Sequence, residues 1–152
     1  SAFSDFTMPK LFFSKVIVVW KRTKFELDLE SFGSLSAYER VTKDKPEVYE
    51  RTLASHERQI SSRKYLRERV FPNADFVFRE EFEDLLKKKK YDLVISHGGD
   101  NHFTYVAHQV ANIPLIGVNS DPFTSVGALL SYTAEELEKE VQQSFIGSEI
   151  EQ

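Results

Sequence analysis

The chain has 152 residues, of which 41% are hydrophobic, so it is long and apolar enough for one domain with a buried core. Its formal net charge of −4 gives no overall electrostatic reason to expect nucleic acid as a partner. The absence of cysteine excludes disulfides and thiolate metal sites, and no stretch approaches the roughly 20 apolar residues of a membrane helix.

The first predicted element is a buried strand. Residues 16–20, Val-Ile-Val-Val-Trp, are an almost uniformly β-branched run, which is typical of a strand covered on both faces. Basic residues follow at Lys21, Arg22 and Lys24. They can either meet a phosphate group or remain as solvated loop charges.

Residues 28–44 are polar and serine-rich without a clear period, and they predict a loop with at most a short helix.

A long helix is predicted over residues 44–71. Asp44 and Glu47 have the spacing of a capping box, and Pro72 ends the apolar periodicity. We interpret His56 as a partly buried residue of this helix, because no second ligand-type residue lies one turn away in a metal-binding pattern.

The next segments predict a strand followed by a helix. Residues 74–78 are short and aromatic, as in a second strand, and residues 80–90 have helical spacing with Phe82 inward. The acidic residues of this helix come first and its lysines last, which complements the helix dipole. The lysine run 87–90 therefore predicts a solvated last turn and not a nucleic-acid patch.

The most informative stretch runs from residue 92 to residue 119. Residues 92–96 are a short apolar strand, followed directly by His97-Gly98-Gly99-Asp100. Two glycines let the backbone turn sharply and approach a ligand, and a helix start presents N–H groups that suit a phosphate. The apolar residues that follow recur at helical spacing (Phe103, Val106, Ala107, Val110). Residues 113–119 are the next predicted strand.

The last segments predict a loop and a closing helix. Asp121-Pro122 and Gly127 indicate a loop, Leu129-Leu130 a brief strand, and Thr133 to Glu136 a capping box. The inward residues of the closing helix are predicted to be Leu137, Val141 and Phe145, and we expect no element beyond Gly147.

The alternation of strands and helices predicts an α/β fold. We expect a doubly wound, mostly parallel, Rossmann-like sheet over residues 15–147, preceded by an N-terminal leader at residues 1–14. Parallel pairing explains why the strands are apolar throughout instead of alternating.

Two motifs resemble those of NAD kinases. Gly98-Gly99-Asp100 after a strand, with Phe103 beyond it, is similar to the Gly-Gly-Asp-Gly motif that NAD kinases share with diacylglycerol-type lipid kinases and phosphofructokinases. The run from Gly117 to Pro122 (Gly-Val-Asn-Ser-Asp-Pro) resembles the mitochondrial-type branch of NAD kinases. The resemblance is to the N-terminal domain of that family and covers residues 15–141 in patches.

The resemblance implies a phosphotransferase that uses ATP and Mg²⁺ to phosphorylate the 2′-hydroxyl of the adenosine ribose of NAD, giving NADP. It implies that Asp100 is the catalytic carboxylate, and a helix N-cap is the alternative or additional role of that residue. Gly98 and Gly99 would offer backbone N–H groups to the substrate or its phosphates. Phe103 would line the nicotinamide side or pack in the core, and Asn119 would bind substrate or shape the turn.

The sequence departs from the family motif at two positions. Asn101 stands where the family has its last motif glycine, and we expect Asn101 to keep a positive φ and to remain in the nucleotide-binding turn. His102 follows where the family has threonine. This histidine can contact phosphate or be a partly exposed residue of the first helical turn.

The family's second, β-rich domain has no counterpart after Gly127, so we expect an N-terminal half of such an enzyme. The isolated chain is then expected to fold without making NADP. Alternatives are a related lipid or sugar kinase domain and a non-catalytic nucleotide-binding domain. The expected setting is a homo-oligomer in the cytoplasm, or alternatively in the mitochondrial matrix, with NAD and ATP as ligands and neither a nucleic-acid nor a membrane partner.

Overall fold

The computed structural model describes residues 14–150, with side chains for residues 14–143, so nearly all of the expected leader lies outside it. One four-stranded parallel sheet runs through the molecule in the order β2-β1-β3-β4. Its strands are β1 (Val16–Trp20), β2 (Asp75–Phe78), β3 (Leu93–Gly98) and β4 (Leu115–Asn119). The four predicted strands are confirmed to within about two residues at each end, a usual boundary error.

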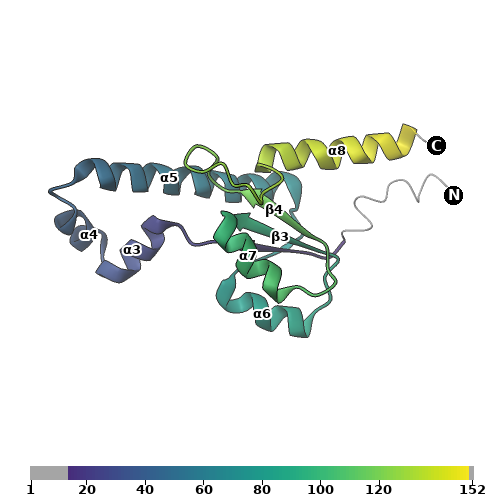
Figure 1. Cartoon of the computed structure of the whole chain (residues 1–152), viewed down its shortest axis with the longest axis horizontal. Coiled ribbons are helices and arrows are strands. Elements are labelled where there is room, and N and C mark those ends of the chain that lie inside the picture. The colour runs from purple at the N-terminus through teal and green to yellow at the C-terminus, as the bar shows by residue number, and fades with distance from the viewer. Residues whose placement is uncertain (1–13, 151–152) are drawn as a thin grey trace.

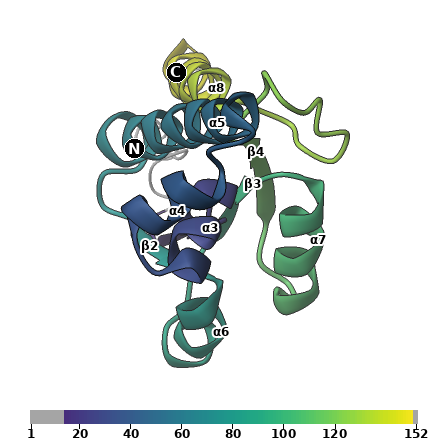
Figure 2. The same ribbon diagram turned by 90° about the vertical axis from the view of Figure 1, so that its left-hand side faces the viewer.

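Helices cover both faces of the sheet. The helices of the described residues are α3 (Lys24–Phe32), α4 (Leu35–Val41), α5 (Pro46–Tyr65) with the π-helical turn η1 (Leu66–Val70), α6 (Arg79–Lys88), α7 (Asp100–Gln109) and α8 (Ala134–Ile150). Helix α3 packs against α4 and α5, and both α3 and α4 lie beyond the end of the sheet (Figure 1). Figures 1 and 2 show α5 and α8 on one face and α6 and α7 on the other. The fold is therefore the expected doubly wound, Rossmann-like α/β arrangement. Within the described range, none of these helices has the length and apolar character to span a membrane.

The central strand β1 is apolar at every position because it serves two cores. Val16, Val18 and Trp20 join a cluster with η1 and α8. Ile17 and Val19 point the other way, into a cluster with α6 and α7. Each residue of β1 is buried. Successive side chains of a strand alternate between the two faces of a sheet, so a strand covered on both faces shows no polar alternation.

The loop predicted over residues 28–44 is wrong, because most of this stretch belongs to α3 and α4. A capping box precedes α3: Glu26 N–H donates to Thr23 Oγ1 at 3.1 Å, and Thr23 N–H donates to Glu26 Oε1 at 2.7 Å. Gly33 ends α3 with φ 85°, a left-handed conformation that glycine adopts without strain. Ser34 then caps α4. These local caps were present in the sequence, and only the lack of apolar periodicity argued against helices.

The capping box predicted at Asp44 and Glu47 is also wrong. Lys45 occupies the cap of α5 without a side-chain hydrogen bond, and Pro46 is the first helical residue. Proline suits that position because its missing N–H would be unpaired there anyway. The helical segment ends at Val70, as Pro72 predicts.

The segment after β4 differs from the prediction at both ends. Leu129-Leu130 do not form a strand, and a single parallel bridge joins Val118 to Tyr132 instead. The capping box from Thr133 to Glu136 is confirmed by reciprocal bonds of 3.2 and 2.8 Å. Helix α8 continues past Gly147, which corrects the expected end. The inward position predicted for Phe145 lies outside the described side chains.

The sheet order creates a topological switch point between β1 and β3. The chain moves from β1 to one neighbour through α3, α4 and α5, and from β3 to the opposite neighbour through α7. The connections leave in opposite directions, so a crevice opens at the carboxyl ends of β1 and β3, where ligands of such sheets bind.

Candidate functional site

A cavity of about 620 Å³ lies at this crevice. Its walls come from the turn after β1, the middle of α5, Gly98 and Gly99 after β3, and the loop that begins at Asn119. In Figure 1 these segments lie at the end of the sheet nearest to α3 and α7. The volume is within the range of small-molecule sites.

Basic side chains dominate the charge of the cavity. Lys21, Lys24, Arg51 and Arg58 line it, and Asp121 is the single acidic residue among the lining residues. Asp121 is paired with Arg58 at 2.8 Å. The excess is therefore local and opposite in sign to the net charge of −4 of the whole chain. A cavity of this kind favours an anionic ligand.

The lining cations differ in their partners. Lys24 Nζ lies 2.6 Å from Asp28, an exposed i,i+4 pair. Among the described side chains, no carboxylate pairs with Lys21 or Arg51. Both residues are exposed. Their charges are thus available to a ligand without breaking an ion pair.

The glycine pair plays two different structural roles. Gly98 is packed: a Cβ there would lie 2.9 Å from His102 Cδ2 and 2.9 Å from Lys21 Cβ. A Cβ on Gly99 would meet nothing within 4 Å. Neither glycine has a positive φ, so the turn needs glycine for close approach at residue 98 and not for backbone strain.

His102 supports this turn from below and is fully buried. The alternatives of a phosphate contact and of a partly exposed residue are therefore both wrong for the described structure. Arg79 Nε–H donates to His102 Nδ1 at 3.0 Å, so the proton of the neutral ring is on Nε2, which lies 2.9 Å from Val19 O and donates to it. This side chain ties the start of α7 to the end of β1.

Burial makes both histidines near the site hard to protonate. Burial lowers the pKa of His102 to about 4, despite the opposing hydrogen bond to Val19 O. Burial also lowers the pKa of His97, the residue before Gly98, to about 3, and the Arg63 charge contributes in the same direction. His97 Nε2 is 2.7 Å from Ser62 Oγ on α5. The two imidazoles are neutral structural groups at neutral pH.

Asp100 is the first residue of α7, and Gly99 is its N-cap, so the N-cap role expected for Asp100 is wrong. Its carboxylate accepts the backbone N–H of Ala128 at 3.1 Å and that of Leu129 at 3.0 Å. Asp100 is half-buried and does not line the cavity. It joins α7 to the loop after β4.

The prediction of a positive φ for Asn101 is wrong. Asn101 lies in the right-handed first turn of α7, and no non-glycine residue of the described chain has a positive φ. The helix begins earlier than the motif suggested, because β3 ends at Gly98 and Gly99 is already the N-cap of α7. The Asn101 side chain is exposed and is not among the cavity-lining residues.

Phe103 and Asn119 have structural contacts. A Cβ on Gly117 would lie 2.8 Å from Phe103 Cδ1, so Phe103 packs on the backbone of β4, outside the cavity. Asn119 does line the cavity, but its Nδ2 donates to Ser125 O at 2.8 Å and its Oδ1 accepts Asp121 N–H at 3.0 Å. These bonds favour the core interpretation of Phe103 and the turn interpretation of Asn119.

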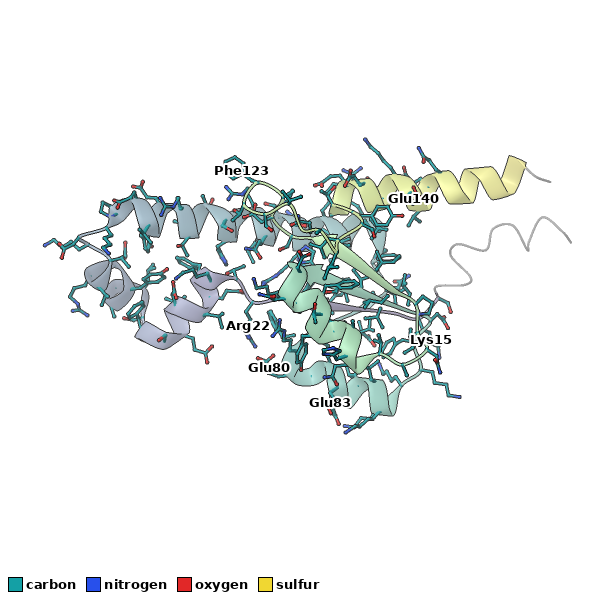
Figure 3. All side chains as sticks on the ribbon, viewed as in Figure 1. Lys15, Arg22, Glu80, Glu83, Phe123 and Glu140 are labelled. Atoms are coloured by element: carbon teal, nitrogen blue, oxygen red, sulfur yellow. The ribbon has the colours of Figure 1, made fainter. Side chains whose placement is uncertain are left out.

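Asp121 anchors the loop after β4 to α5. Its carboxylate accepts bonds from Ser55 Oγ at 2.5 Å, Arg58 Nε at 2.8 Å and Thr124 Oγ1 at 2.6 Å. Burial alone would raise the pKa of Asp121, but these hydrogen bonds outweigh it and lower the pKa. Figure 3 shows Phe123 at the tip of the same loop, where the Arg58 guanidinium lies 4.4 Å from its ring centroid.

The sequence interpretation missed the contribution of α5. Arg51, Ser55 and Arg58 are spaced i, i+4, i+7, which places them on one face of the helix. All three line the cavity. The helical spacing of these polar residues is present in the sequence. Their proximity to Gly98 and Gly99 depends on the fold, so the sequence alone did not indicate that they belong to the site.

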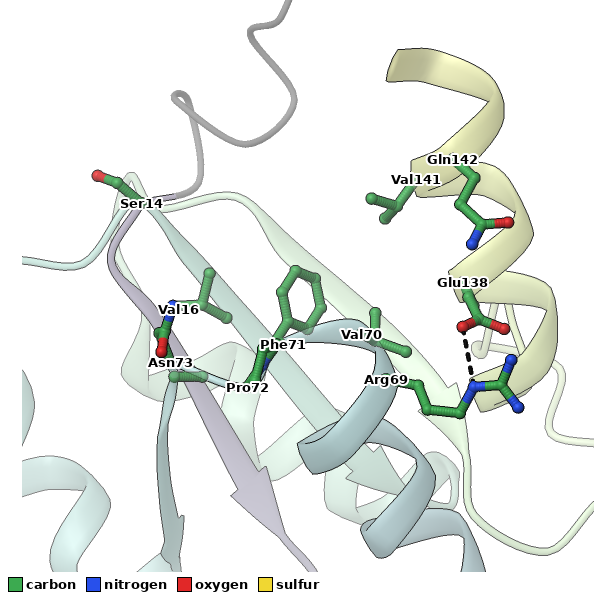
Figure 4. Close-up of a pocket in the computed structure, with 11 residues that line it drawn as sticks. Ser14, Val16, Arg69, Val70, Phe71, Pro72, Asn73, Glu138, Val141 and Gln142 are labelled. Atoms are coloured by element: carbon green, nitrogen blue, oxygen red, sulfur yellow. Dashed lines mark hydrogen bonds and ion pairs between the residues drawn. The ribbon is translucent and has the colours of Figure 1, made fainter. Parts of the chain in front are cut away.

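Another cavity, of about 520 Å³, lies at the amino end of β1. Figure 4 shows it between η1 and α8, with Val16, Phe71 and Val141 among its lining residues. Its charged residues, Arg69 and Glu138, are paired with each other at 3.2 Å. It therefore lacks both the cationic excess and the glycine pair of the first cavity.

Comparisons with known proteins do not identify a family for this chain. No protein-family model matches the chain, and no curated protein sequence matches it.

Proposed function

We propose that the chain is a nucleotide-binding α/β domain that serves ATP-dependent phosphorylation of the 2′-hydroxyl of the adenosine ribose of NAD. One observation carries the proposal: Gly98 and Gly99 border a cavity whose unpaired lining charges, Lys21 and Arg51, are cationic. Glycine backbone that borders a cavity beside unpaired positive charge is a favourable environment for phosphate groups.

Phosphoryl transfer requires positioning and charge neutralisation, and little covalent participation by the protein. In the proposed reaction, the cations of the cavity offset the phosphate charge, and Gly99 lets the nucleotide approach the backbone. Asp100 would orient the ribose hydroxyl. Each of its carboxylate oxygens accepts one backbone N–H, which leaves a lone pair on each oxygen for a substrate hydroxyl.

Mg²⁺ enters the proposed reaction as part of the substrate, bound to the phosphates of ATP. Within residues 14–143, no group of three histidine, aspartate or glutamate side chains is arranged to hold a metal ion. Asp121 is committed to Ser55, Arg58 and Thr124, and Asp100, which keeps acceptor capacity, is a single carboxylate that does not line the cavity. The described residues thus do not fit a protein-bound Mg²⁺, and no step of the proposed reaction passes through one.

A second candidate function is nucleotide binding without catalysis. It is favoured by the position of Asp100, which does not line the cavity and is bonded to the loop backbone at Ala128 and Leu129. In this alternative Asp100 only secures the loop, and the cavity binds a nucleotide as a ligand.

An assay of NADP formation separates the two candidates. Because the isolated chain is expected to fold without making NADP, the assay uses the full-length natural protein that contains these residues. The protein is incubated with ATP, Mg²⁺ and NAD, and NADP is measured beside calorimetric titration with ATP. NADP formation that is lost in Asp100→Asn, with ATP affinity unchanged, supports the kinase. ATP binding without NADP supports the second candidate, and absence of any nucleotide binding contradicts both.

A further inference from the structure

We infer that Lys21, Lys24 and Arg51 together bind the polyphosphate of the nucleotide, so that α5 forms the second wall of the site opposite Gly98 and Gly99. This inference rests on the proposed nucleotide-binding function and deepens it. The ligand class is a polyphosphate chain, as in a nucleoside triphosphate.

The turn after β1 holds Lys21 directly beside the glycine pair. Lys21 N–H donates to His97 O at 3.0 Å, which continues the β1–β3 pairing by one residue. A Cβ on Gly98 would lie 2.9 Å from Lys21 Cβ. The stem of Lys21 is thus fixed against the turn, while its ammonium group belongs to an exposed side chain that borders the cavity.

Lys24 extends the cationic wall from the start of α3. Its ammonium group lies 2.6 Å from Asp28, and its side chain is 69% exposed. An exposed i,i+4 ion pair is weak because water screens it, so a phosphate can compete with Asp28 for Lys24.

Arg51 brings positive charge from the opposite side. It lies on the cavity face of α5, seven residues before Arg58. Arg58 is bound to Asp121 through Nε and Nη2 at 2.8 and 3.2 Å. Arg51 is therefore the guanidinium of this wall that has no carboxylate partner among the described side chains. A guanidinium can bind phosphate oxygens in a bidentate manner.

The excess of cationic over acidic residues lining the cavity favours a ligand with several negative charges. The cavity has four cationic lining residues and one acidic residue, and the acid is neutralised by one of the cations. Lys21 and Arg51 remain without a carboxylate partner, and Lys24 is held only by its exposed pair with Asp28, so cationic groups face two walls of a cavity of about 620 Å³. A single carboxylate would leave most of this charge without a partner, whereas a chain of phosphates can reach both walls.

Calorimetric titrations of Lys21→Gln, Arg51→Gln and the double variant test the inference. The probes are MgATP, inorganic tripolyphosphate and adenosine, each at low and at high salt. Lys64→Gln is the matched control, because Lys64 is an exposed residue of the same helix that does not line the cavity. All substituted side chains are exposed, so the variants should fold, and thermal melts check this.

Each single substitution should raise the Kd for tripolyphosphate and MgATP about tenfold, because a charge-assisted contact is lost. The double variant should lose more, the affinity should fall with salt, and Lys64→Gln should behave like the unchanged chain. Binding of adenosine should not change.

The outcomes separate this inference from the proposed function. If MgATP binds equally well to the double variant, the polyphosphate site is overturned while nucleotide binding stands. If tripolyphosphate binds through Lys21 and Arg51 but MgATP does not bind, the site stands and the proposed function fails. If neither probe binds the unchanged chain, both are overturned.

Discussion

Two connections meet at the carboxyl end of the sheet, and each carries an aspartate. In the loop after β4, Asp121 is only 6% exposed and accepts hydrogen bonds from Ser55, Arg58 and Thr124. At the turn after β3, Asp100 is half-buried and accepts two backbone N–H groups of Ala128 and Leu129. The first carboxylate holds the loop onto a helix, and the second has acceptor capacity left for another group.

The difference shows how a cavity wall stays open. At the end of β4 and in the loop after it, the polar atoms of Asn119 and Asp121 already form the hydrogen bonds that hold the loop in place, so they are not available to a ligand. The turn after β3 is instead held from beneath by His102, so its outer surface at Gly99 carries no side chain. A ligand can approach such a surface without displacing protein hydrogen bonds.

Asp121→Ala should have the largest effect on stability. The free energy of unfolding should fall by about 2–3 kcal/mol, because the half-buried Ser55 and Arg58 and the exposed Thr124 lose their acceptor. The loss stays below that of a fully buried pair because the Arg58 side chain is 37% exposed and can reach water. Chemical denaturation measures it, with exposed Asp44→Ala as the control. Equal losses in both variants would show that the loop is not held by Asp121.

Acidification should lower the free energy of unfolding, because it favours protonation of His97 and His102, the buried histidines at the turn after β3. The pKa of His102 is about 4 and that of His97 about 3, below the unfolded value of about 6.5, so the unfolded state binds more protons as the pH falls. Stability should decrease from pH 6.5 downward, by about 1.5 kcal/mol per histidine by pH 5.

His102→Gln provides the control for this pH dependence. The amide can donate to Val19 O and accept from Arg79 but does not titrate. Roughly half of the histidine contribution to the fall should therefore disappear. Denaturant melts at pH 6.5 and 5 measure it, and an unchanged fall would mean that His102 is not the titrating group.

The two glycines of the turn should respond differently to alanine. Gly98→Ala should cost about 1 kcal/mol or more, because the new Cβ would collide with His102 and Lys21 at 2.9 Å. Gly99→Ala should stay within about 0.5 kcal/mol, because its Cβ would enter open space. Denaturation curves of both variants decide this, and equal costs would contradict the open surface described above.

Asp100→Asn should also have only a small effect on stability. The loss should be below about 1 kcal/mol, because the amide oxygen can still accept one of the two loop N–H groups. In the NADP assay the same variant should lose turnover, since an amide is a poor acceptor for the ribose proton. A loss of stability as large as that of Asp121→Ala would mean that Asp100 is chiefly a structural anchor.

The sequence by itself determined the layers of this protein. The apolar runs at residues 16–20 and 92–96 identify strands buried on both faces, which the structure gives as Val16–Trp20 and Leu93–Gly98, and the capping box at Thr133 and Glu136 marks the start of α8. These features are local: the periodicity and end signals of an element lie within its own residues. The missed helices α3 and α4 had such end signals too, at Thr23 and Ser34.

Only the tertiary structure decided which polar side chains are used and which remain available. His102 is bonded to Val19, 83 residues away, and Arg58 to Asp121, 63 residues away. No local pattern encodes such pairs, because they form where crossing elements bring distant residues together. The same crossing places Arg51 opposite Gly98 and Gly99. Most buried polar groups find their partners where the fold brings distant elements together, and Lys21 and Arg51, which have no carboxylate partner among the described side chains, mark the candidate site.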